Sequence, residues 1–219
     1  MVLRALRPFA SHRDVSHIAL VLPPDFAARP PAFLSNLTTQ SPSPSPRDAR
    51  GKLSPSSPPS STLTIVPGGT HRGDSVRAGI TALPVECTIV LVHDGARPFV
   101  DSRTIDAVIE CARQGEAAVP AVPLSDTLKE AVADDPTRVS RTRPRERLWR
   151  AQTPQGFPRR VLEDAHARAA QLGRRATDDS ALVEAMGFPV RLIRGFSTNI
   201  KITTPEDFAL AELLAGGTR

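Results

Sequence analysis

An apolar run followed at once by a carboxylate offers the clearest chemistry in this sequence. Residues 88–92 are β-branched or apolar, and the turn His93-Asp94-Gly95-Ala96-Arg97-Pro98 comes directly after them. We predict a buried strand over 88–92, because such runs are typical of strands inside parallel sheets. Ligands of open α/β sheets bind beyond the carboxyl ends of the strands. Asp94 is therefore placed to hold a divalent cation or a substrate, and a turn or helix-cap role is the alternative from the residues alone.

Two further segments combine glycine, hydroxyl or ammonium groups with the end of an element. Residues 68–75, from Gly68-Gly69 to Ser75, lie between a predicted strand and a predicted helix. Glycine lets a ligand approach the backbone, and the N–H groups of a helix N-terminus favour anions. Lys201 interrupts an otherwise apolar segment that we expect to be a strand. An unpaired buried ammonium is costly, so Lys201 should face an anion.

Threonines recur in three predicted loops, each beside an aspartate or a proline. They are Thr127, Thr153 and Thr177. Their hydroxyls and the neighbouring backbone N–H groups could bind a phosphate, although each pattern alone is also typical of a helix cap.

The elements that would position these groups alternate along the chain. We expect strands over residues 17–22, 62–66, 88–92, 117–122 and 190–193, and helices over residues 2–10, 74–83, 101–114, 157–172, 178–186 and 205–214. This alternation indicates a single α/β domain over residues 1–219, with a mostly parallel, doubly wound sheet and helices on both faces.

Two segments interrupt the alternation. Residues 38–62 are dominated by Ser and Pro. They contain too little apolar surface to offset the entropy of ordering, so we expect a disordered loop, with a ligand for a proline-binding module as the alternative. Residues 126–147 are polar and rich in arginine. A long excursion of this kind is either functional, for example a dimerisation arm, or a solvated loop.

Composition narrows the class of protein. Lys and Arg number 28 against 23 Asp and Glu, for a formal charge of +5, and aromatic residues make up 4%. This modest excess suits phosphate-bearing small ligands, and we expect no nucleic-acid partner. Cys87 and Cys111 lack metal-ligand spacing and indicate reduced thiols in the cytoplasm. No apolar stretch approaches the roughly 18 residues of a membrane span, and no signal peptide is evident.

Six motifs in order resemble one family. They are Gly68-Gly69-x-x-Arg72-x-x-Ser75-Val76, Val92-His93-Asp94-Gly95-Ala96-Arg97-Pro98, Asp126-Thr127-Leu128-Lys129, Leu148-Trp149-x-x-Gln152-Thr153-Pro154-Gln155, Thr177-Asp178-Asp179 and Asn199-Ile200-Lys201-Ile202-Thr203-x-Pro205-Glu206-Asp207. This set resembles the 2-C-methyl-D-erythritol 4-phosphate cytidylyltransferases. The resemblance implies a Rossmann-like nucleotidyltransferase fold, a homodimer, and Mg²⁺ as the cofactor. It also implies a reaction of the non-mevalonate isoprenoid pathway, the transfer of a cytidylyl group from CTP to the sugar-alcohol phosphate with release of pyrophosphate.

The resemblance also implies roles for individual residues. Asp94 matches the aspartate that binds magnesium, and Lys201 matches the catalytic lysine that orients the sugar phosphate. The residues implied to bind the nucleotide are Gly68, Gly69, Ser75, Asp94 and Gly95, and those implied to bind the substrate are Thr127, Thr153, Thr177 and Arg145. Arg145 would belong to a dimerisation arm over 126–147 that reaches into the partner's site.

One part of the family pattern has no counterpart. Family members begin with a strand and a loop of the form Ala-Ala-Gly-x-Gly-x-Arg, followed by a lysine, which cradle the triphosphate, and nothing in residues 1–31 matches them. We expect that the chain lacks the first βα unit, through a late start or degeneration. It should then be poorly active, because each lost transition-state contact costs on the order of a few kcal/mol. A cytidylyltransferase for another polyol phosphate, such as ribitol 5-phosphate, and a non-catalytic binding relic are the alternatives.

Overall fold

The computed structural model describes residues 1–34 and 61–216. The segment predicted to be disordered, 38–62, lies outside the described residues except for its last two positions. No helix in the described part of the chain is both long enough and apolar enough to cross a membrane.

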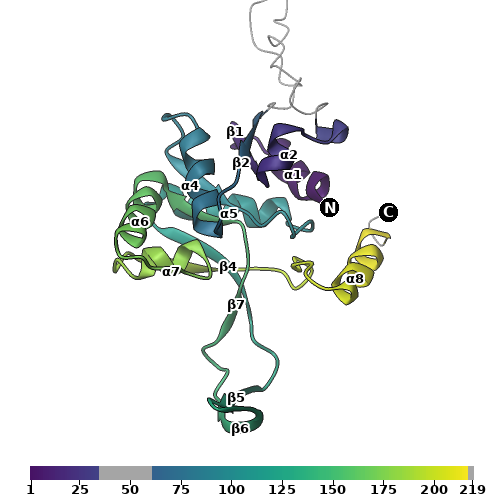
Figure 1. The fold of residues 1–219 in the computed structure, drawn as a ribbon, viewed down its shortest axis with the longest axis vertical. Coiled ribbons are helices and arrows are strands. Elements are labelled where there is room, and N and C mark those ends of the chain that lie inside the picture. The colour runs from purple at the N-terminus through teal and green to yellow at the C-terminus, as the bar shows by residue number, and fades with distance from the viewer. Residues whose placement is uncertain (35–60, 217–219) are drawn as a thin grey trace, which may run out of the picture.

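Helices and strands alternate up to residue 123, as the pattern of apolar residues predicts, whereas residues 117–158 hold five successive strands and residues 159–184 two successive helices (Figure 1). In order they are α1 (Val2–Ala10), β1 (His17–Leu22), α2 (Pro24–Ala28), β2 (Thr62–Pro67), α4 (Arg72–Ala82), β3 (Ile89–Val92), α5 (Ser102–Arg113), β4 (Ala117–Pro123), β5 (Leu128–Val132), β6 (Asp135–Arg143), β7 (Trp149–Ala151), β8 (Gln155–Pro158), α6 (Arg159–Gln171), α7 (Asp179–Glu184), β9 (Val190–Arg194) and α8 (Pro205–Gly216). The predicted α/β class is confirmed.

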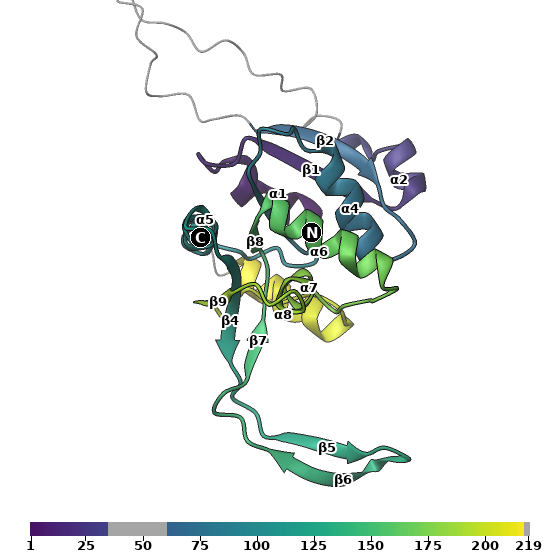
Figure 2. The same ribbon diagram turned by 90° about the vertical axis from the view of Figure 1, so that its left-hand side faces the viewer.

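The strands form three sheets of mixed direction, and most pairs are antiparallel, so the expectation of a mostly parallel sheet was too narrow. β1 and β2 pair in parallel, with His17 opposite Thr62. A larger sheet has the order β3-β8-β4-β7, and β9 pairs with β4. Within it the β4–β9 pair is parallel, whereas β8 runs antiparallel to both β3 and β4. The hairpin of β5 and β6 forms the third sheet and stands away from the body in both views (Figures 1 and 2).

Two local predictions were wrong. The helix expected from residue 157 begins only at Arg159, because residues 155–158 form β8 between β3 and β4. The segment around Lys201, expected to be a strand, belongs to no strand of the described chain. Its backbone is attached to the Asp94 turn through Ile202, whose N–H donates to the carbonyl of Ala96 at 2.9 Å.

Helices cover the larger sheet on two sides. α6 and α7 pack with α4 on one cluster of buried residues, which includes Phe157, Leu162 and Val183. α5 packs on separate clusters. The approach of α5 to β8 requires a glycine, because a Cβ at Gly156 would lie 2.3 Å from Cγ1 of Val108. β8 is largely buried and β3 is half-buried with Val90 in the core, and the ends of both strands adjoin the polar groups described below.

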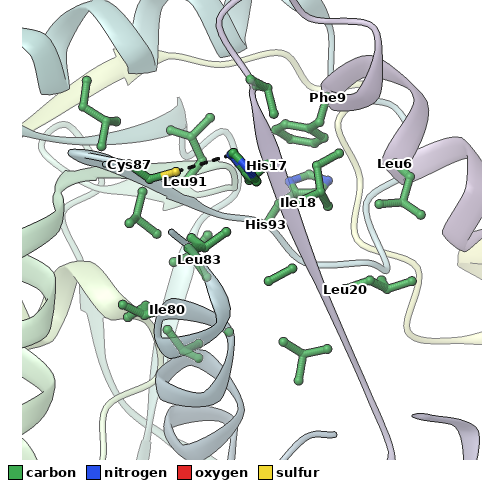
Figure 3. Close-up of a pocket in the computed structure, with 18 of the residues that line it drawn as sticks. Leu6, Phe9, His17, Ile18, Leu20, Ile80, Leu83, Cys87, Leu91 and His93 are labelled. Carbon is green, nitrogen blue, oxygen red and sulfur yellow. Dashed lines mark hydrogen bonds between the residues drawn. The ribbon is translucent and has the colours of Figure 1, made fainter. Parts of the chain in front are cut away.

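A cavity of about 600 Å³ separates β1 from β3 (Figure 3). Among the described strands, β1 pairs only with β2 and β3 pairs with β8 alone, so each has one edge without a strand partner. Apolar side chains line the space, among them Ile18 and Leu20 of β1, Leu91 of β3 and Ile80 of α4. An extended segment placed here could pair with both edges. The predicted lack of an opening βα unit stays a prediction.

Candidate active site

A polar cleft of about 220 Å³ lies at the carboxyl end of β3. It brings together four of the residues predicted from the sequence, namely Asp94, Thr153, Thr177 and Lys201. The other side chains at its walls are Arg72, Arg97, Gln152, Gln155 and Asp178. Three cations and two carboxylates thus share one small space, which is the composition expected of a site for phosphorylated ligands.

Asp94 is the anionic centre of the cleft. Its Oδ2 lies 3.0 Å from Nζ of Lys201 and 3.5 Å from Nε of Arg97. Burial acts to raise the pKa of Asp94, but the hydrogen bond and charge of Lys201, together with the charges of Arg72 and Arg97, outweigh burial and lower that pKa. Asp94 is therefore ionised at neutral pH. The anion that Lys201 was expected to face is Asp94.

A chain of hydrogen bonds holds the turn that carries Asp94. The N–H of Asp94 donates to Oγ1 of Thr153 at 3.0 Å, and Oγ1 lies 3.0 Å from Nδ1 of His93. Nε2 of His93 lies 3.0 Å from the carbonyl of Arg97, which can only accept. The proton of a neutral His93 must then be on Nε2, so Nδ1 accepts from the Thr153 hydroxyl. Thr153 thereby links β8 to the turn after β3.

The loop before α8 is attached to the same turn, and this attachment positions Lys201. Nη1 of Arg97 donates to the carbonyl of Asn199 at 2.8 Å, and Nδ2 of Asn199 donates to the carbonyl of Thr153 at 2.9 Å. Nε2 of Gln152 donates to the carbonyl of Phe196 at 2.8 Å. Irregular backbone fixed by side chains, rather than a strand, therefore presents Lys201. The sequence suggested only a structural ion pair for Arg97 and no role for Gln152, although both lie within the quoted motifs.

Asp178 fits a structural role better than a metal-binding one. Its Oδ1 accepts from the N–H of Ala181 at 3.0 Å, which caps α7. Its Oδ2 accepts from Nε2 of Gln155 at 2.7 Å and from the hydroxyl of Ser180 at 3.1 Å. Both oxygens are thus engaged. Asp94, whose carboxylate contacts side-chain cations that a metal ion could displace, is the better ligand for Mg²⁺, which needs one or two carboxylates alongside substrate phosphates.

A second group of possible metal ligands lies outside the cleft. His12, Asp14 and Asp106 bring one ligand atom each within 4.8 Å of one another. The cations Arg13 and Arg113 already contact these carboxylates, Arg113 at 2.8 Å from Asp14. Nε2 of His12 lies 3.2 Å from Asp106, while its Nδ1 accepts from the N–H of Asp14. This group is compensated without a metal.

The residues predicted to bind the nucleotide lie at a neighbouring position. Gly68 and Gly69 form the turn between β2 and α4, where the N–H of Gly69 donates to Oγ of Ser75 at 3.2 Å. A Cβ at Gly69 would lie 2.3 Å from Cβ of Asp74, so the turn requires glycine there. Ser75 and Gly95 border the 600 Å³ cavity rather than the cleft, whereas Asp94 borders both spaces. The two spaces therefore meet at the Asp94 turn.

Thr127 and Arg145 are not brought to the cleft within this chain. Both are exposed on the arm formed by residues 126–147. The guanidinium of Arg145 donates to the carbonyl of Ser125 at the base of the hairpin. Glu130 pairs with Arg141 and Arg143 across the hairpin, so the arm is held together by its own charges.

The buried state of His93 predicts a specific loss of stability in acid. Burial lowers the pKa of His93 from 6.5 to about 4. As the pH falls, the unfolded chain therefore protonates His93 below about pH 6.5, whereas the folded chain does so only near pH 4. The free energy of unfolding is highest above about pH 6.5 and decreases between about pH 6.5 and pH 4. We expect about 3 kcal/mol of unfolding free energy to be lost, measured by urea denaturation at several pH values. His93→Asn should be less stable at pH 7 and decline less steeply; an equal decline in both proteins would contradict the assignment.

Comparisons with known proteins identify the family. Residues 1–216 match the family model of 2-C-methyl-D-erythritol 4-phosphate cytidylyltransferase. A relative of that name from Streptomyces coelicolor is 40% identical over 224 residues, which cover all of this chain and 75% of the relative. The bifunctional enzyme IspD/IspF of Desulforudis audaxviator is 54% identical over 155 residues, 71% of this chain and 39% of that protein. A cytidylyltransferase from Syntrophus aciditrophicus is 47% identical over 148 residues, 68% of this chain and 62% of the relative. The match thus spans less than two thirds of the length of the last two relatives.

Solved structures show the same fold. The crystal structure of the cytidylyltransferase from Thermus thermophilus aligns with a TM-score of 0.71 and 35% identity, covering 98% of this chain and 89% of that one. The 4-diphosphocytidyl-2C-methyl-D-erythritol synthase of Anaerococcus prevotii aligns with a TM-score of 0.79 and 25% identity, covering 98% and 88%.

Proposed function

Since this chain belongs to the 2-C-methyl-D-erythritol 4-phosphate cytidylyltransferase family, we propose that it transfers a cytidylyl group from CTP to 2-C-methyl-D-erythritol 4-phosphate and releases pyrophosphate. The product would enter isoprenoid precursor biosynthesis in the cytoplasm, where free thiols such as Cys87 and Cys111 persist. One observation carries the proposal. Asp94, Lys201, Thr153 and Thr177, which four separate motifs of the sequence supply, meet in one polar cleft.

The reaction requires no covalent bond between the protein and a substrate. An oxygen of the alcohol phosphate attacks the α-phosphorus of CTP, a new P–O bond forms, and the bond from that phosphorus to the bridging oxygen of pyrophosphate breaks. Catalysis then depends on positioning and on stabilising negative charge. Lys201 can donate to phosphate oxygens once a substrate competes for it with Asp94, and the hydroxyl of Thr153 is fixed beside the Asp94 turn.

Mg²⁺ fits the site through Asp94. When bound there with the phosphates of CTP, it would neutralise the charge of the triphosphate and of the leaving pyrophosphate. The strong cationic surroundings of Asp94 keep its carboxylate ionised and available at neutral pH.

The arm over residues 126–147 suits a homodimer in which each cleft is completed by the other subunit. The hairpin extends away from its own body (Figure 2). It carries Thr127 and Arg145 in exposed positions, and Val139 on it is 59% exposed. Apolar side chains at its base, Leu148 and Trp149, are also exposed. A second subunit would bury this apolar surface and receive Arg145 as an additional phosphate-binding cation.

A pyrophosphate-release assay with CTP, Mg²⁺ and 2-C-methyl-D-erythritol 4-phosphate tests the proposal. We expect release to require all three components and to be at least about tenfold slower with ribitol 5-phosphate, because a polar site built for one substrate discriminates strongly. Faster release with ribitol 5-phosphate would identify a different polyol phosphate as the substrate. Calorimetric binding of the phosphoalcohol without any pyrophosphate release would indicate a binding relic. The rate of pyrophosphate release by the natural chain also tests the expectation that a chain without the first βα unit is poorly active.

A further inference from the structure

Arg72 begins α4 at the junction of the two spaces and has an unusual partner. It borders both the 600 Å³ cavity and the polar cleft. Its Nη2 lies 2.7 Å from Oδ2 of Asp179, the residue that opens α7. The Arg72 side chain is 35% exposed, whereas that of Asp179 is 1% exposed. A cation at the wall of the cleft is thus paired with an anion inside the protein.

A histidine is the third member of this chain of contacts. Nε2 of His166, from α6, lies 2.9 Å from Oδ1 of Asp179, and its side chain is also buried. Burial acts to raise the pKa of Asp179, but the hydrogen bond from His166 and the close contact and charge of Arg72 outweigh burial and lower that pKa. Asp179 is therefore a carboxylate at neutral pH, held from two sides in a fixed orientation.

A purely structural role does not account for this arrangement. Burying a carboxylate costs several kcal/mol before its partners repay the cost, so a buried ion pair is weak evidence of stabilisation. Oδ2 of Asp179 is buried and has no partner with hydrogen-bond geometry among the described residues, so the ion pair with the Arg72 guanidinium is what compensates its charge. What the arrangement does achieve is a guanidinium held by charge at the wall of the cleft, where its N–H donors can bind a ligand.

The other charges of the cleft make this position suited to an anion. Burial acts to lower the pKa of Arg72, but the contact with Asp179, followed by the charges of Asp94 and Asp178, outweighs burial and raises that pKa. Arg72 therefore stays a cation beside the cleft. Lys201 borders the same space. Arg97, the remaining cation, donates to the carbonyl of Asn199 and is only 13% exposed. Arg72 and Lys201 are thus the two cations of the cleft best placed to receive an incoming phosphate.

We propose that Arg72 binds a phosphate group of a substrate in the polar cleft, and that Asp179 and His166 are positioning residues that orient its guanidinium. The inference rests on the proposed function for the identity of the substrates. The phosphate belongs either to the sugar-alcohol phosphate or to CTP, and the chemistry of recognition is the same for both. A planar guanidinium binds phosphate through two parallel N–H groups, which a lysine cannot reproduce.

Calorimetric titration tests the proposal without requiring turnover. Three probes are used separately on the full chain, namely 2-C-methyl-D-erythritol 4-phosphate, CTP with Mg²⁺, and inorganic pyrophosphate. Arg72→Lys should lower the affinity for at least one of these probes by about tenfold or more. The probe whose affinity falls most identifies the molecule that carries the phosphate bound by Arg72. Arg77→Lys is the matched control, because Arg77 lies on the same helix, pairs with Asp74 at 2.7 Å and borders neither space. It should leave all three affinities within about twofold.

A double-mutant cycle separates positioning from general support of the fold. Asp179→Asn should lower the affinity of the natural chain for the same probe by about threefold to tenfold. In the Arg72→Lys variant the same substitution should change that affinity little further. His166→Gln should behave as Asp179→Asn does, more weakly. Equal effects of Asp179→Asn in both backgrounds would show that Asp179 does not act through Arg72.

The outcomes for this inference and for the proposed function are distinct. If a folded Arg72→Lys variant, with unchanged thermal melting, binds all three probes as the natural chain does, the role of Arg72 is refuted. Failure of the natural chain to bind any probe would refute it as well. A third outcome separates the two proposals. If Arg72→Lys lowers the affinity for a probe that the natural chain binds, but the natural chain releases no pyrophosphate, the inference about Arg72 holds and the proposed transfer reaction is refuted.

Discussion

Lys201→Ala should lower kcat/KM for 2-C-methyl-D-erythritol 4-phosphate by about 100-fold or more, because removing one donor to a developing phosphate charge typically costs this much. Nζ of Lys201 lies 3.0 Å from Asp94, and its side chain is 45% exposed. The side chain can therefore move from Asp94 to a substrate phosphate, while Arg97, 3.5 Å from Oδ2 of Asp94, continues to compensate that carboxylate. The measurement is the initial rate of pyrophosphate release over a range of both substrates.

Two further variants define what this loss means. Lys201→Arg keeps a cation at the same position and should recover part of the activity. Arg168→Ala removes an exposed positive charge from α6, away from the cleft, and should leave kcat/KM within about twofold. An activity of Lys201→Ala close to that of the natural chain would contradict the assignment of Lys201 as the catalytic lysine.

Asp94→Asn should have an effect of similar size, about 100-fold on kcat, together with a weakened dependence on Mg²⁺. The substitution keeps the shape of the side chain, and the backbone N–H of Asp94 can still donate to Thr153. It removes the charge that pairs with Lys201 and Arg97. The loss therefore reports on the carboxylate rather than on collapse of the turn. The measurement is the rate of pyrophosphate release against Mg²⁺ concentration.

An exposed aspartate provides the control for this variant. Asp164→Asn on α6 removes the same charge from a position outside the cleft and should keep the Mg²⁺ dependence of the natural chain. A normal Mg²⁺ titration in Asp94→Asn would place the cation elsewhere, for example at His12, Asp14 and Asp106.

Local patterns predicted the elements well where a cap or a periodic run marks them. Asp101 accepts from the N–H of Thr104 at 2.8 Å and begins α5 where expected. Asp207 and Thr204 form reciprocal hydrogen bonds at the start of α8, the arrangement of a capping box. β8 was missed, because Gln155-Gly156-Phe157-Pro158 has no alternation of its own and is held by strands far away in the sequence.

Part of the candidate site was likewise predictable from local sequence, and part was not. Residue types and motif order identified Asp94, Lys201, Thr153 and Thr177, since a carboxylate after a buried strand or a lysine between isoleucines is visible locally. The loop that presents Lys201 was not predictable, because its geometry comes from hydrogen bonds between Arg97, Asn199 and Thr153. Arg72 likewise owes its role to Asp179 and His166, which lie about a hundred residues further along the chain and reach it only through packing.

The sequence by itself determined the α/β class, the caps and glycine turns, and the chemical groups available for binding phosphate, because these depend on residue type and on spacing within one element. Only the tertiary structure decided which of those groups share a space. It joined the Asp94 turn to Lys201 and buried a carboxylate behind Arg72. It left Thr127 and Arg145 on an arm outside the cleft and kept β1 apart from β3. These outcomes depend on contacts between distant segments, where burial and charge compensation over the whole fold, rather than local propensity, set the arrangement.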